Sequence, residues 1–582
     1  MARREIQHRW EWRLRSSPQA LWPLVADTNR FNRDAGVPPL EGGDVGQDGR
    51  RHLRLSKLGV AVEWEEEPFE WVEPHRFSVR RRYDSGPVAE MTVTAELRPE
   101  PSGGTLLVYR VASRPRNALG TLAIPLQIGL LSRRRFARTF REYDEIASRP
   151  EPGGGGARRA SLVPGGNRRA AAARETLLGQ GLSPELVDRL AELIVSADDM
   201  TVARLRPYAF ADLWGADRRD VLELFLHATR AGLLELRWDL LCPLCRGAQE
   251  RGRSLGEVEA RVHCPSCAID FDVDFERSVE LSFRPSAAIR DISEREFCVG
   301  GPQLTPHIAA QQLLPPGAER SLELTLESGR YRLRTREAPS GRPVLVESAG
   351  AREAAVHLDE SGWRSGEAAL AERASLRLVN STRREQLFVL ERAAWSDQVV
   401  TAAEVTTLQV FRDLFSSEAL RPDEPISVGS LTLLFTDLRD STRFYREVGD
   451  ASAFGSVMEH LDVLHDVVKA EDGAVVKAMG DAIMAVFRRP VFAVRAALRA
   501  QREVGSPRAG GRPLLLKAGV HSGPCIAVNQ NGRLDYFGST VNLAARLVAL
   551  STGSDVVVSD AVLADPEVSD ELAEEIACAE PL

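Results

Sequence analysis

The fold of the C-terminal part of the chain is decided by residues 431–442, LTLLFTDLRDST, and by residues 475–487, VVKAMGDAIMAVF. Each stretch contains a run of apolar or β-branched residues next to an aspartate, a pattern that predicts a buried strand with a carboxylate at its tip. In the second stretch Gly480-Asp481 stands between two apolar runs, which indicates a hairpin turn. Carboxylates on neighbouring strand ends are the hard oxygen ligands that Mg²⁺ or Mn²⁺ requires, so Asp437 and Asp481 are predicted metal ligands.

A third stretch, residues 534–547, LDYFGSTVNLAARL, follows downstream. Asn542 and Arg546 are four residues apart, so on a helix they share one face. An amide and a guanidinium on one face can orient a sugar and neutralise charge that develops on a phosphate.

These motifs resemble the catalytic domain of class III nucleotidyl cyclases, and the resemblance covers residues 428–565. It implies four groups of site residues that lie in or next to the three stretches. They are the metal ligands Asp437, Asp481 and Leu438 (backbone), the transition-state residues Asn542 and Arg546, the purine-reading pair Lys477 and Asp535, and the phosphate-binding residues Arg439, Ser441 and Thr442.

The resemblance also implies the reaction and the assembly. With two Mg²⁺ or Mn²⁺ ions per active site, the ribose 3′-hydroxyl would attack the α-phosphate of a nucleoside triphosphate and release pyrophosphate. A head-to-tail homodimer is implied, in which the carboxylates of one chain face the purine-reading and transition-state residues of the other.

The choice of purine can be argued from hydrogen-bonding chemistry alone. Adenine offers an acceptor at N1 and a donor at its amino group, whereas guanine offers the reverse. Lysine carries only donors and an ionised aspartate only acceptors, so Lys477 with Asp535 fits adenine. A site whose side chains hydrogen-bond the edge of one purine rejects the other purine, because the polar groups of the site are then left unpaired. The sequence therefore predicts an adenylate cyclase that converts ATP to cyclic AMP.

Two departures from the family pattern keep other interpretations open. Asp440 stands where the family often has glycine in the phosphate-cradling turn, and it adds a negative charge there. The chain has no lysine after Lys517 and ends at Leu582, where the family usually continues into a strand with a phosphate-binding lysine; Arg439 or Arg443 are possible replacements. A catalytically inactive nucleotide-binding regulator is one alternative, and a zinc-ribbon adaptor is another.

Length and composition predict a multi-domain α+β protein. At 582 residues the chain is longer than a single hydrophobic core accommodates, so several domains are expected. Its content of 43% hydrophobic and 27% charged residues is ordinary for globular domains. The net charge of −8 gives no overall attraction to nucleic acid. The N-terminus has no apolar signal segment, and seven cysteines, four of them in a metal-like pattern, argue against a disulfide scaffold, so the cytoplasm is expected.

The longest apolar run, residues 118–131, is too short to span a bilayer, so no transmembrane segment is expected. Because Arg133, Arg134 and Arg135 follow it, contact with a membrane surface is one interpretation. Ordinary packed structure is the other, and it is the one favoured here.

Residues 1–148 resemble a START-like (SRPBCC) helix-grip domain, because an early strand, a short helix, alternating strands and a long terminal helix follow in that order. The resemblance implies a site for a small hydrophobic ligand; a filled core is the alternative. Residues 149–172 are rich in glycine and predict a flexible linker. A helical scaffold module is expected over residues 173–240.

Two CxxC knuckles within residues 241–277 predict a zinc ribbon with one structural Zn²⁺. All four positions of the tetrahedral shell are filled by thiolates, so no open position is left for catalysis. The ligands are Cys242, Cys245, Cys264 and Cys267.

Alternating apolar residues predict a β-sandwich over residues 278–396. Residues 397–427 are expected to hold a helix that opens at a capping box, Thr401 to Glu404. It is either a transducer between the upstream modules and the catalytic domain or an ordinary packed connector. The remaining residues, 428–582, are expected to form the catalytic domain with a ferredoxin-like α/β core.

Overall fold

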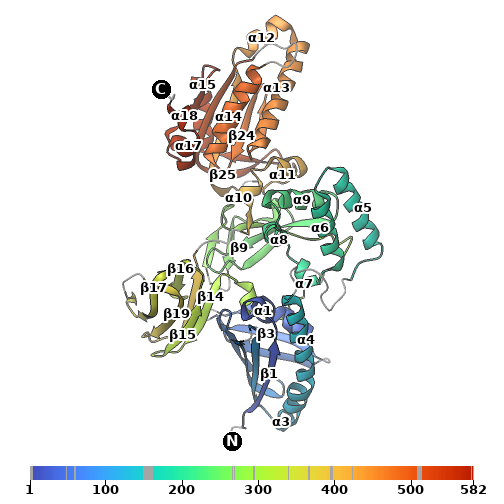
Figure 1. Cartoon of the computed structure of the whole chain (residues 1–582), viewed down its shortest axis with the longest axis vertical. Coiled ribbons are helices and arrows are strands. Elements are labelled where there is room, and N and C mark those ends of the chain that lie inside the picture. The colour runs from blue at the N-terminus through green and yellow to red at the C-terminus, as the bar shows by residue number, and fades with distance from the viewer. Residues whose placement is uncertain are drawn as a thin grey trace.

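A computed structural model shows an elongated molecule with the C-terminal domain at one end and the N-terminal domain at the other (Figure 1). The structure describes residues 4–46, 49–57, 60–101, 103–148, 161–264, 267, 269–292, 295–338, 340–364, 368–393, 398–422, 424–506, 514–577 and 580. Among these residues no helix combines the length and the apolar character needed to cross a membrane.

The N-terminal domain is a curved antiparallel sheet packed against a long helical segment. Its core is aromatic: the rings of Trp12 and Phe31 lie 5.0 and 5.1 Å from that of Phe140, which is fully buried. These side chains fill the space between helix and sheet, where the START-like resemblance implies a ligand. The elements are β1 (Ile6–Leu14), α1 (Pro18–Val25), α2 (Thr28–Asp34), β2 (Leu40–Val45), β3 (Arg51–Lys57), β4 (Val60–Glu66), β5 (Glu70–Val72), β6 (Arg76–Tyr83), β7 (Val88–Pro99), β8 (Thr105–Pro115), α3 (Ala118–Ile124), the π-helical η1 (Pro125–Ser132) and α4 (Arg133–Ala147).

The central module holds five helices, a four-stranded sheet and the cysteine knuckles. Its first helix, α5, begins at Gly166, inside the range expected to be a linker, because an alanine-rich run follows the left-handed Gly165 (φ 78°). Residues 149–160 lie outside the described residues. The elements are α5 (Gly166–Gly179), α6 (Pro184–Ser196), α7 (Asp199–Val202), α8 (Pro207–Trp214), α9 (Arg218–Arg230), β9 (Leu234–Leu241), β10 (Ala248–Gly252), η2 (Leu255–Glu257), β11 (Arg261–Cys264), β12 (Ile269–Asp272) and β13 (Val279–Pro285).

The strands after residue 300 enclose one apolar core, but they are joined to the rest of the chain, unlike a separate sandwich over residues 278–396. β13 pairs with β9 of the central module instead, and β14 pairs with β5, so one sheet continues into the N-terminal domain. Such pairings join distant segments, and local alternation cannot reveal them. The elements are η3 (Pro302–Leu304), β14 (Ile308–Leu314), β15 (Glu319–Thr325), β16 (Gly329–Arg334), β17 (Arg342–Asp359), β18 (Gly362–Trp363), β19 (Ala368–Asn380) and β20 (Gln386–Arg392).

The connector to the C-terminal domain contains two short helices rather than one. β21 (Val400–Thr401) joins the central sheet, and α10 (Ala402–Val405) and α11 (Gln409–Leu414) follow. Thr401 caps α10 by accepting a hydrogen bond from the amide of Glu404. The helix breaks at Thr406 and Thr407, whose hydroxyls bond back to the carbonyls of Ala402 and Glu404, an arrangement that competes with helix continuation.

The C-terminal domain is a mixed α/β unit whose sheet runs in the order β23-β24-β22-β25-β26. Side chains of the central β22 alternate between two cores: Leu431, Leu433 and Phe435 face the core shared with the connector, and Leu434 and Leu438 face the core under α13 and α14. The elements are β22 (Ile426–Leu438), α12 (Ser441–Val448), α13 (Asp450–Ala470), β23 (Ala474–Met479), β24 (Ala482–Phe487), α14 (Pro490–Gly505), β25 (Leu516–Gln530), β26 (Arg533–Phe537), α15 (Ser539–Leu550), β27 (Val556–Val558), α16 (Asp560–Leu563), α17 (Pro566–Glu571) and α18 (Ala573–Ala577).

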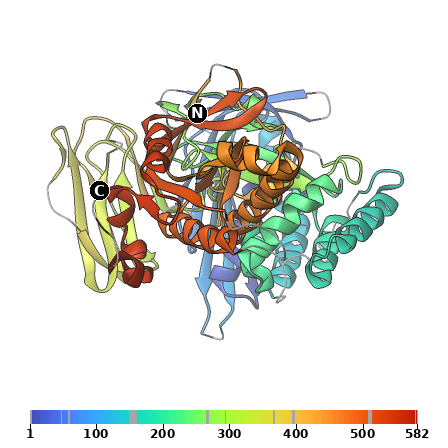
Figure 2. The ribbon, with the colours of Figure 1, turned by 90° about the horizontal axis from the view of Figure 1, so that it is seen from above.

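The domains share their cores. One apolar cluster extends from the helices of the central module through the connector into the face of β22. Seen from above, the C-terminal domain lies over the centre, with the β14–β20 strands on one side and α5 on the other (Figure 2). The C-terminal domain is therefore packed directly against the modules that precede it.

Candidate active site

The two predicted metal-binding carboxylates lie at the same end of adjacent strands. Thr436 of β22 pairs with Ile483 of β24. Asp437 directly follows Thr436, and Asp481 lies two residues before Ile483. Asp481 sits in the two-residue turn between β23 and β24, where Gly480 has φ +71°. Glycine at the first turn position gives a hairpin the twist it needs, so the sequence folds locally in a way that delivers Asp481 to the tip.

The electrostatics of this pair favour a cation. Burial and, secondly, the negative charge of Asp481 raise the pKa of Asp437, while Lys517 and the amide of Leu438 act in the opposite direction. Oδ2 of Asp481 is buried and has no hydrogen-bond partner among the described residues. Leaving a buried carboxylate oxygen unpaired is costly, and a hard divalent cation between two carboxylates would relieve that cost. These residues therefore fit Mg²⁺ or Mn²⁺.

His460, which the sequence indicates is an ordinary helix residue, contacts the turn that carries Asp481. It lies on α13 with 3% of its surface exposed, and its Nε2 lies 3.2 Å from the backbone oxygen of Asp481. Because a carbonyl only accepts, Nε2 carries the proton and the ring holds the turn in place. Burial lowers the pKa of His460 and keeps it neutral. Its place among the apolar residues of α13 made it look like an ordinary helix residue.

Lys477 and Asp535 form a direct ion pair. Nζ of Lys477 lies 2.6 Å from Oδ2 of Asp535, and Oδ1 of Asp535 accepts the amide of Tyr536 at 2.8 Å. The aspartate is buried, whereas the lysine is partly exposed. The sequence predicted these two residues as a functional pair, and the structure brings them together from β23 and β26.

Asn542 and Arg546 lie on one exposed face of α15, which begins just after Gly538. Among the described residues neither side chain has a hydrogen bond or an ion pair. Phe537 and Leu543 beside them are exposed by 62% and 46%. An apolar, solvent-exposed surface with an unpaired guanidinium is the pattern of half a site that another surface completes.

The turn between β22 and α12 contains the predicted phosphate-binding residues. Arg439 donates to the carbonyl of Thr552 at 2.8 Å and lies 3.6 Å from the carboxylate of Asp440. Ser441 and Thr442 begin α12. Asp440 has φ +54°, a left-handed conformation that favours glycine and tolerates aspartate. Its side chain points outward, 71% exposed, so the added charge lies at the surface beside Arg439.

The connector contacts both strands that carry the Lys477–Asp535 pair. Oε1 of Gln409 accepts the amide of Val475, two residues before Lys477, at 2.7 Å. Arg412 donates to the carbonyl of Leu534 at 3.1 Å, and its guanidinium lies 5.2 Å from the ring centre of Tyr536. The sequence gave no signal for these contacts, because they join segments more than 60 residues apart.

The four predicted zinc ligands meet in one cluster. Their sulfur atoms all lie within 4.8 Å of one another, and those of Cys245 and Cys264 are 3.7 Å apart. A tetrahedral site with Zn–S bonds near 2.3 Å has edges of about 3.8 Å. Hydrogen bonds from its neighbours lower the pKa of Cys242, whereas bonding to Cys242 raises the pKa of Cys264. The cluster can hold a metal ion.

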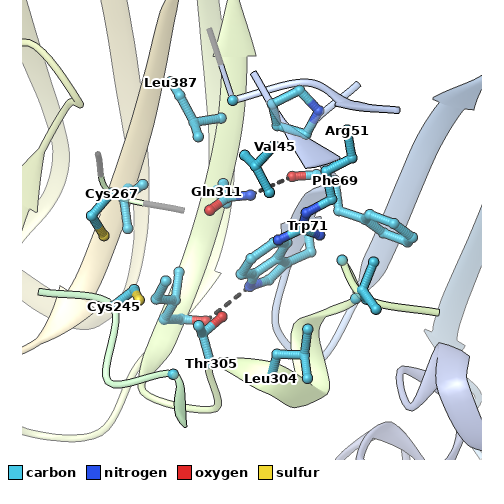
Figure 3. A pocket seen from close by; sticks show the side chains of 18 of the residues that line it. Val45, Arg51, Phe69, Trp71, Cys245, Cys267, Leu304, Thr305, Gln311 and Leu387 are labelled. Atoms are coloured by element: carbon cyan, nitrogen blue, oxygen red, sulfur yellow. Dashed lines mark hydrogen bonds between the residues drawn. The ribbon is translucent and has the colours of Figure 1, made fainter. Parts of the chain in front are cut away.

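A cavity of about 460 Å³ lies where the N-terminal sheet, the cysteine cluster and the β14–β20 strands meet (Figure 3). Trp71, Phe69 and Leu387 form part of its apolar wall, and Cys245 and Cys267 line another part. The indole of Trp71 donates to the carbonyl of Ile308. Nη1 and Nη2 of Arg336, which also lines the cavity, are buried without a hydrogen-bond partner among the described residues, as is Oε1 of Glu66.

Two family models match the chain. Residues 424–570 match the adenylate and guanylate cyclase catalytic domain, and residues 169–297 match a family of unknown function, DUF5939. The second match covers most of the central module.

Curated relatives match part of the chain. Adenylate cyclase 1 of Rhizobium meliloti (strain 1021) is 30% identical over 152 residues, which cover 23% of this chain and 23% of the relative. An uncharacterised protein of Mycobacterium tuberculosis (strain ATCC 25618 / H37Rv) is 36% identical over 125 residues, or 22% of this chain and 31% of the relative. The chain thus spans less than a third of the length of either relative.

Among solved structures, the adenylyl cyclase CyaB from P. aeruginosa is 22% identical with a TM-score of 0.23, covering 25% of this chain and 83% of that one. The segment that the family model matches includes β22 to β26 and α15, which carry the predicted site residues. Residues 424–570 are therefore an adenylate/guanylate cyclase catalytic domain.

Proposed function

We propose that the chain is an adenylate cyclase that converts ATP to 3′,5′-cyclic AMP and pyrophosphate. The observation that carries the choice of ATP is the ion pair between Lys477 and Asp535. The pair presents a donor and an acceptor side by side, which matches N1 and the amino group of adenine and opposes the pattern of guanine. Burial of Asp535 strengthens the discrimination, since guanine would place an acceptor against a buried carboxylate, which itself only accepts.

Each group of residues has a distinct task in this proposal. When bound by Asp437, Asp481 and the backbone of Leu438, two Mg²⁺ or Mn²⁺ ions would supply Lewis-acid activation of the ribose hydroxyl and of the phosphate. Asn542 orients the ribose. Arg546 neutralises the charge that develops on the α-phosphate.

The triphosphate is proposed to lie at the turn before α12. Arg439, Ser441 and Thr442 offer a guanidinium and two hydroxyls there. Exposure of these groups, together with the outward direction of Asp440, supports access by a triphosphate.

We propose that two chains complete each site as a head-to-tail homodimer. Among the described residues, no hydrogen bond or ion pair joins the carboxylate pair to Asn542 or Arg546 of α15. Large apolar side chains are exposed on that face and beside Asp481, among them Phe537 and Met479. Burying them against a second copy would unite the two half-sites.

We further propose that the cysteine cluster binds one structural Zn²⁺ and that the modules before the catalytic domain regulate it. Thiolate ligands need reducing conditions, which places the protein in the cytoplasm in this proposal. The aromatic filling of the N-terminal domain favours the cavity of Figure 3 as the regulatory ligand site. Arg336 there would bind the anionic group of a ligand whose apolar part contacts Trp71 and Leu387.

The proposal is tested by product analysis. Purified full-length protein is incubated with ATP or GTP and Mn²⁺, and the products are separated by chromatography beside an Asp437→Ala variant. Cyclic AMP from the wild type alone supports the proposal. Nucleotide binding with no cyclic product would instead identify an inactive regulator, the alternative that the charge of Asp440 suggests.

A further inference from the structure

The segment α3–η1, residues 118–132, carries a row of leucines that faces solvent. Leu119, Leu122, Leu126 and Leu130 are exposed by 67%, 76%, 59% and 57%, and Leu131 by 55%. Spacings of three, four and four residues place the first four on one face of the helix. The interpretation favoured from sequence, ordinary packed structure, is therefore wrong for this face.

The opposite face of the same segment contacts the sheet: Gly120 and Ile124 are buried, and Ile128 and Gly129 are half-buried. Ile124 is 2% exposed. Two glycines allow a close approach. A Cβ atom at Gly120 would lie 2.1 Å from the carbonyl oxygen of Pro87, and a Cβ atom at Gly129 would lie 2.7 Å from the His8 ring. These contacts turn one face of the segment towards the sheet and leave the leucines on the outer face.

Arginines flank this leucine row along the chain, and Arg4 and Glu5 lie beside Leu122. Residues 117–132 contain no charged side chain, and exposed arginines follow it directly. Arg133 and Arg134 are exposed and have no ion pair among the described residues. Arg114 and Arg116 precede the row and are also exposed. Arg114 forms an ion pair with Glu90 at 3.1 Å, and Arg116 donates a hydrogen bond to the carbonyl of Tyr83. An apolar strip between basic flanks stands out on a chain with a net charge of −8.

We propose that this leucine row binds the surface of a membrane that contains anionic lipids. Interfacial helices have this composition: leucines enter the boundary between headgroups and acyl chains while arginines contact anionic headgroups. The segment lies at the end of the molecule opposite the catalytic domain (Figure 1). Binding there would hold the cyclase domain away from the lipid surface with its half-sites accessible.

A second copy of the chain is a poorer occupant. An antiparallel pair of leucine rows would bring Arg133 and Arg134 of one copy towards Arg114 and Arg116 of the other. A parallel pair would bring each arginine towards its own equivalent. Both arrangements oppose like charges, whereas an anionic lipid surface complements them.

The test is co-sedimentation of the full-length protein with vesicles. Phosphatidylcholine vesicles are compared with vesicles in which about one-third of the lipid is phosphatidylglycerol. We expect binding to the anionic vesicles only, with a bound fraction that falls when salt is raised, since headgroup attraction is screened. The double variant Leu122→Glu/Leu126→Glu should reduce partitioning at least about tenfold.

Two further variants make the result specific. Leu345→Glu alters a leucine that is 41% exposed on β17, far from the row, and should bind like the wild type. Arg133→Glu/Arg134→Glu leaves the leucines and their packing unchanged and should also weaken binding to anionic vesicles. Equal sedimentation with both kinds of vesicle, no sedimentation with either, or a leucine-dependent dimer that ignores vesicles would each overturn the proposal.

Discussion

Nζ of Lys477 lies 2.6 Å from Oδ2 of Asp535 although β23 and β26 are at opposite ends of the strand order in the catalytic sheet. The sheet therefore curls until its two ends meet. The connector contacts both ends. Gln409 of α11 accepts a hydrogen bond from β23, and Arg412 of α11 donates one to β26. This arrangement fixes the donor–acceptor pattern that the proposed function assigns to adenine, and it links that pattern physically to the modules upstream.

Reversing the hydrogen-bonding pattern at position 477 should reverse the purine preference. Lys477→Glu replaces a donor with an acceptor, so we expect ATP turnover to fall at least about a hundredfold, because buried polar groups would face the wrong edge. The ratio of GTP to ATP turnover should rise. The measurement is kcat/KM for both nucleotides. Lys477→Met serves as the control, since it removes the donor and adds no acceptor; an unchanged purine ratio in Lys477→Glu would show that the pair does not read the base.

Neutralising Asp437 should stabilise the metal-free protein while it abolishes turnover. Burial and the Asp481 charge raise the pKa of Asp437, so the folded chain takes up this proton at a higher pH than the unfolded chain. The ionised carboxylate therefore costs stability at neutral pH, and the metal-free wild type should gain stability as the pH falls through the raised pKa. Asp437→Asn should raise Tm in EDTA by about 1–3 °C.

Added Mn²⁺ provides the matching comparison for Asp437→Asn. The wild type should gain thermal stability from the metal, because only the folded state holds both carboxylates together. The variant should gain much less. Equal metal-induced shifts in both proteins would contradict the assignment of Asp437 as a ligand.

Loosening the connector should slow catalysis without unfolding the domain. Arg412→Ala removes the hydrogen bond to the carbonyl of Leu534 and the contact with the Tyr536 ring, so Asp535 between them is less well positioned. We expect kcat to fall between about threefold and a hundredfold, the range typical of small misplacements of binding groups. Arg421→Ala is the matched control, because Arg421 lies in the same connector but donates to carbonyls of the central module. Equal losses in both variants would argue for a general structural effect.

The cysteine cluster should contain one equivalent of zinc in protein purified without chelator. Cys264→Ser should lower the zinc content and the Tm together, since binding free energy of such sites is folding free energy. Elemental analysis and thermal unfolding measure the two effects. Cys298 follows β13 and is a buried thiol that packs into the core of the N-terminal domain, so Cys298→Ala should keep the metal. Full zinc occupancy in Cys264→Ser would exclude the four-thiolate site.

The cavity beside Arg336 should prefer an anionic ligand with an apolar body. 1-Anilinonaphthalene-8-sulfonate is a suitable probe because it combines both features. Arg336→Gln should weaken binding at least about fivefold by removing a charge-assisted contact. Arg373→Gln changes an exposed arginine on β19 and serves as the control. Identical affinities in all three proteins would show that the probe binds elsewhere.

The sequence allowed prediction of those features that local chemistry determines. The run before Asp437 alternates between two buried faces, Gly480 suits its turn, and the spacing of Asn542 and Arg546 follows the helix period, so these elements could be recognised without a structure. The cysteine spacing likewise indicated a cluster. Each of these features lies within about 30 residues, where periodicity and turn chemistry are informative.

The remaining features depend on contacts between distant segments. The pairing of β14 with β5, the place of β13 in the central sheet and the contact of Gln409 with Val475 leave no local pattern. Exposure was also misjudged: the apolar composition of residues 118–131 suggested a packed segment, but composition does not say which face of a helix finds a partner. His460 was missed for the same reason, since its role depends on a turn 21 residues away.

Complementation between two inactive variants tests most directly whether two chains join their half-sites to cyclise ATP. Asp437→Ala and Arg546→Ala should each be inactive alone, because each removes one half of every site. Mixed in equal amounts, they should form heterodimers with one intact site and recover about a quarter of wild-type cyclic AMP production per chain, with activity that falls on dilution. No recovery from mixtures of folded, dimeric variants, or full activity in either variant alone, would contradict the account.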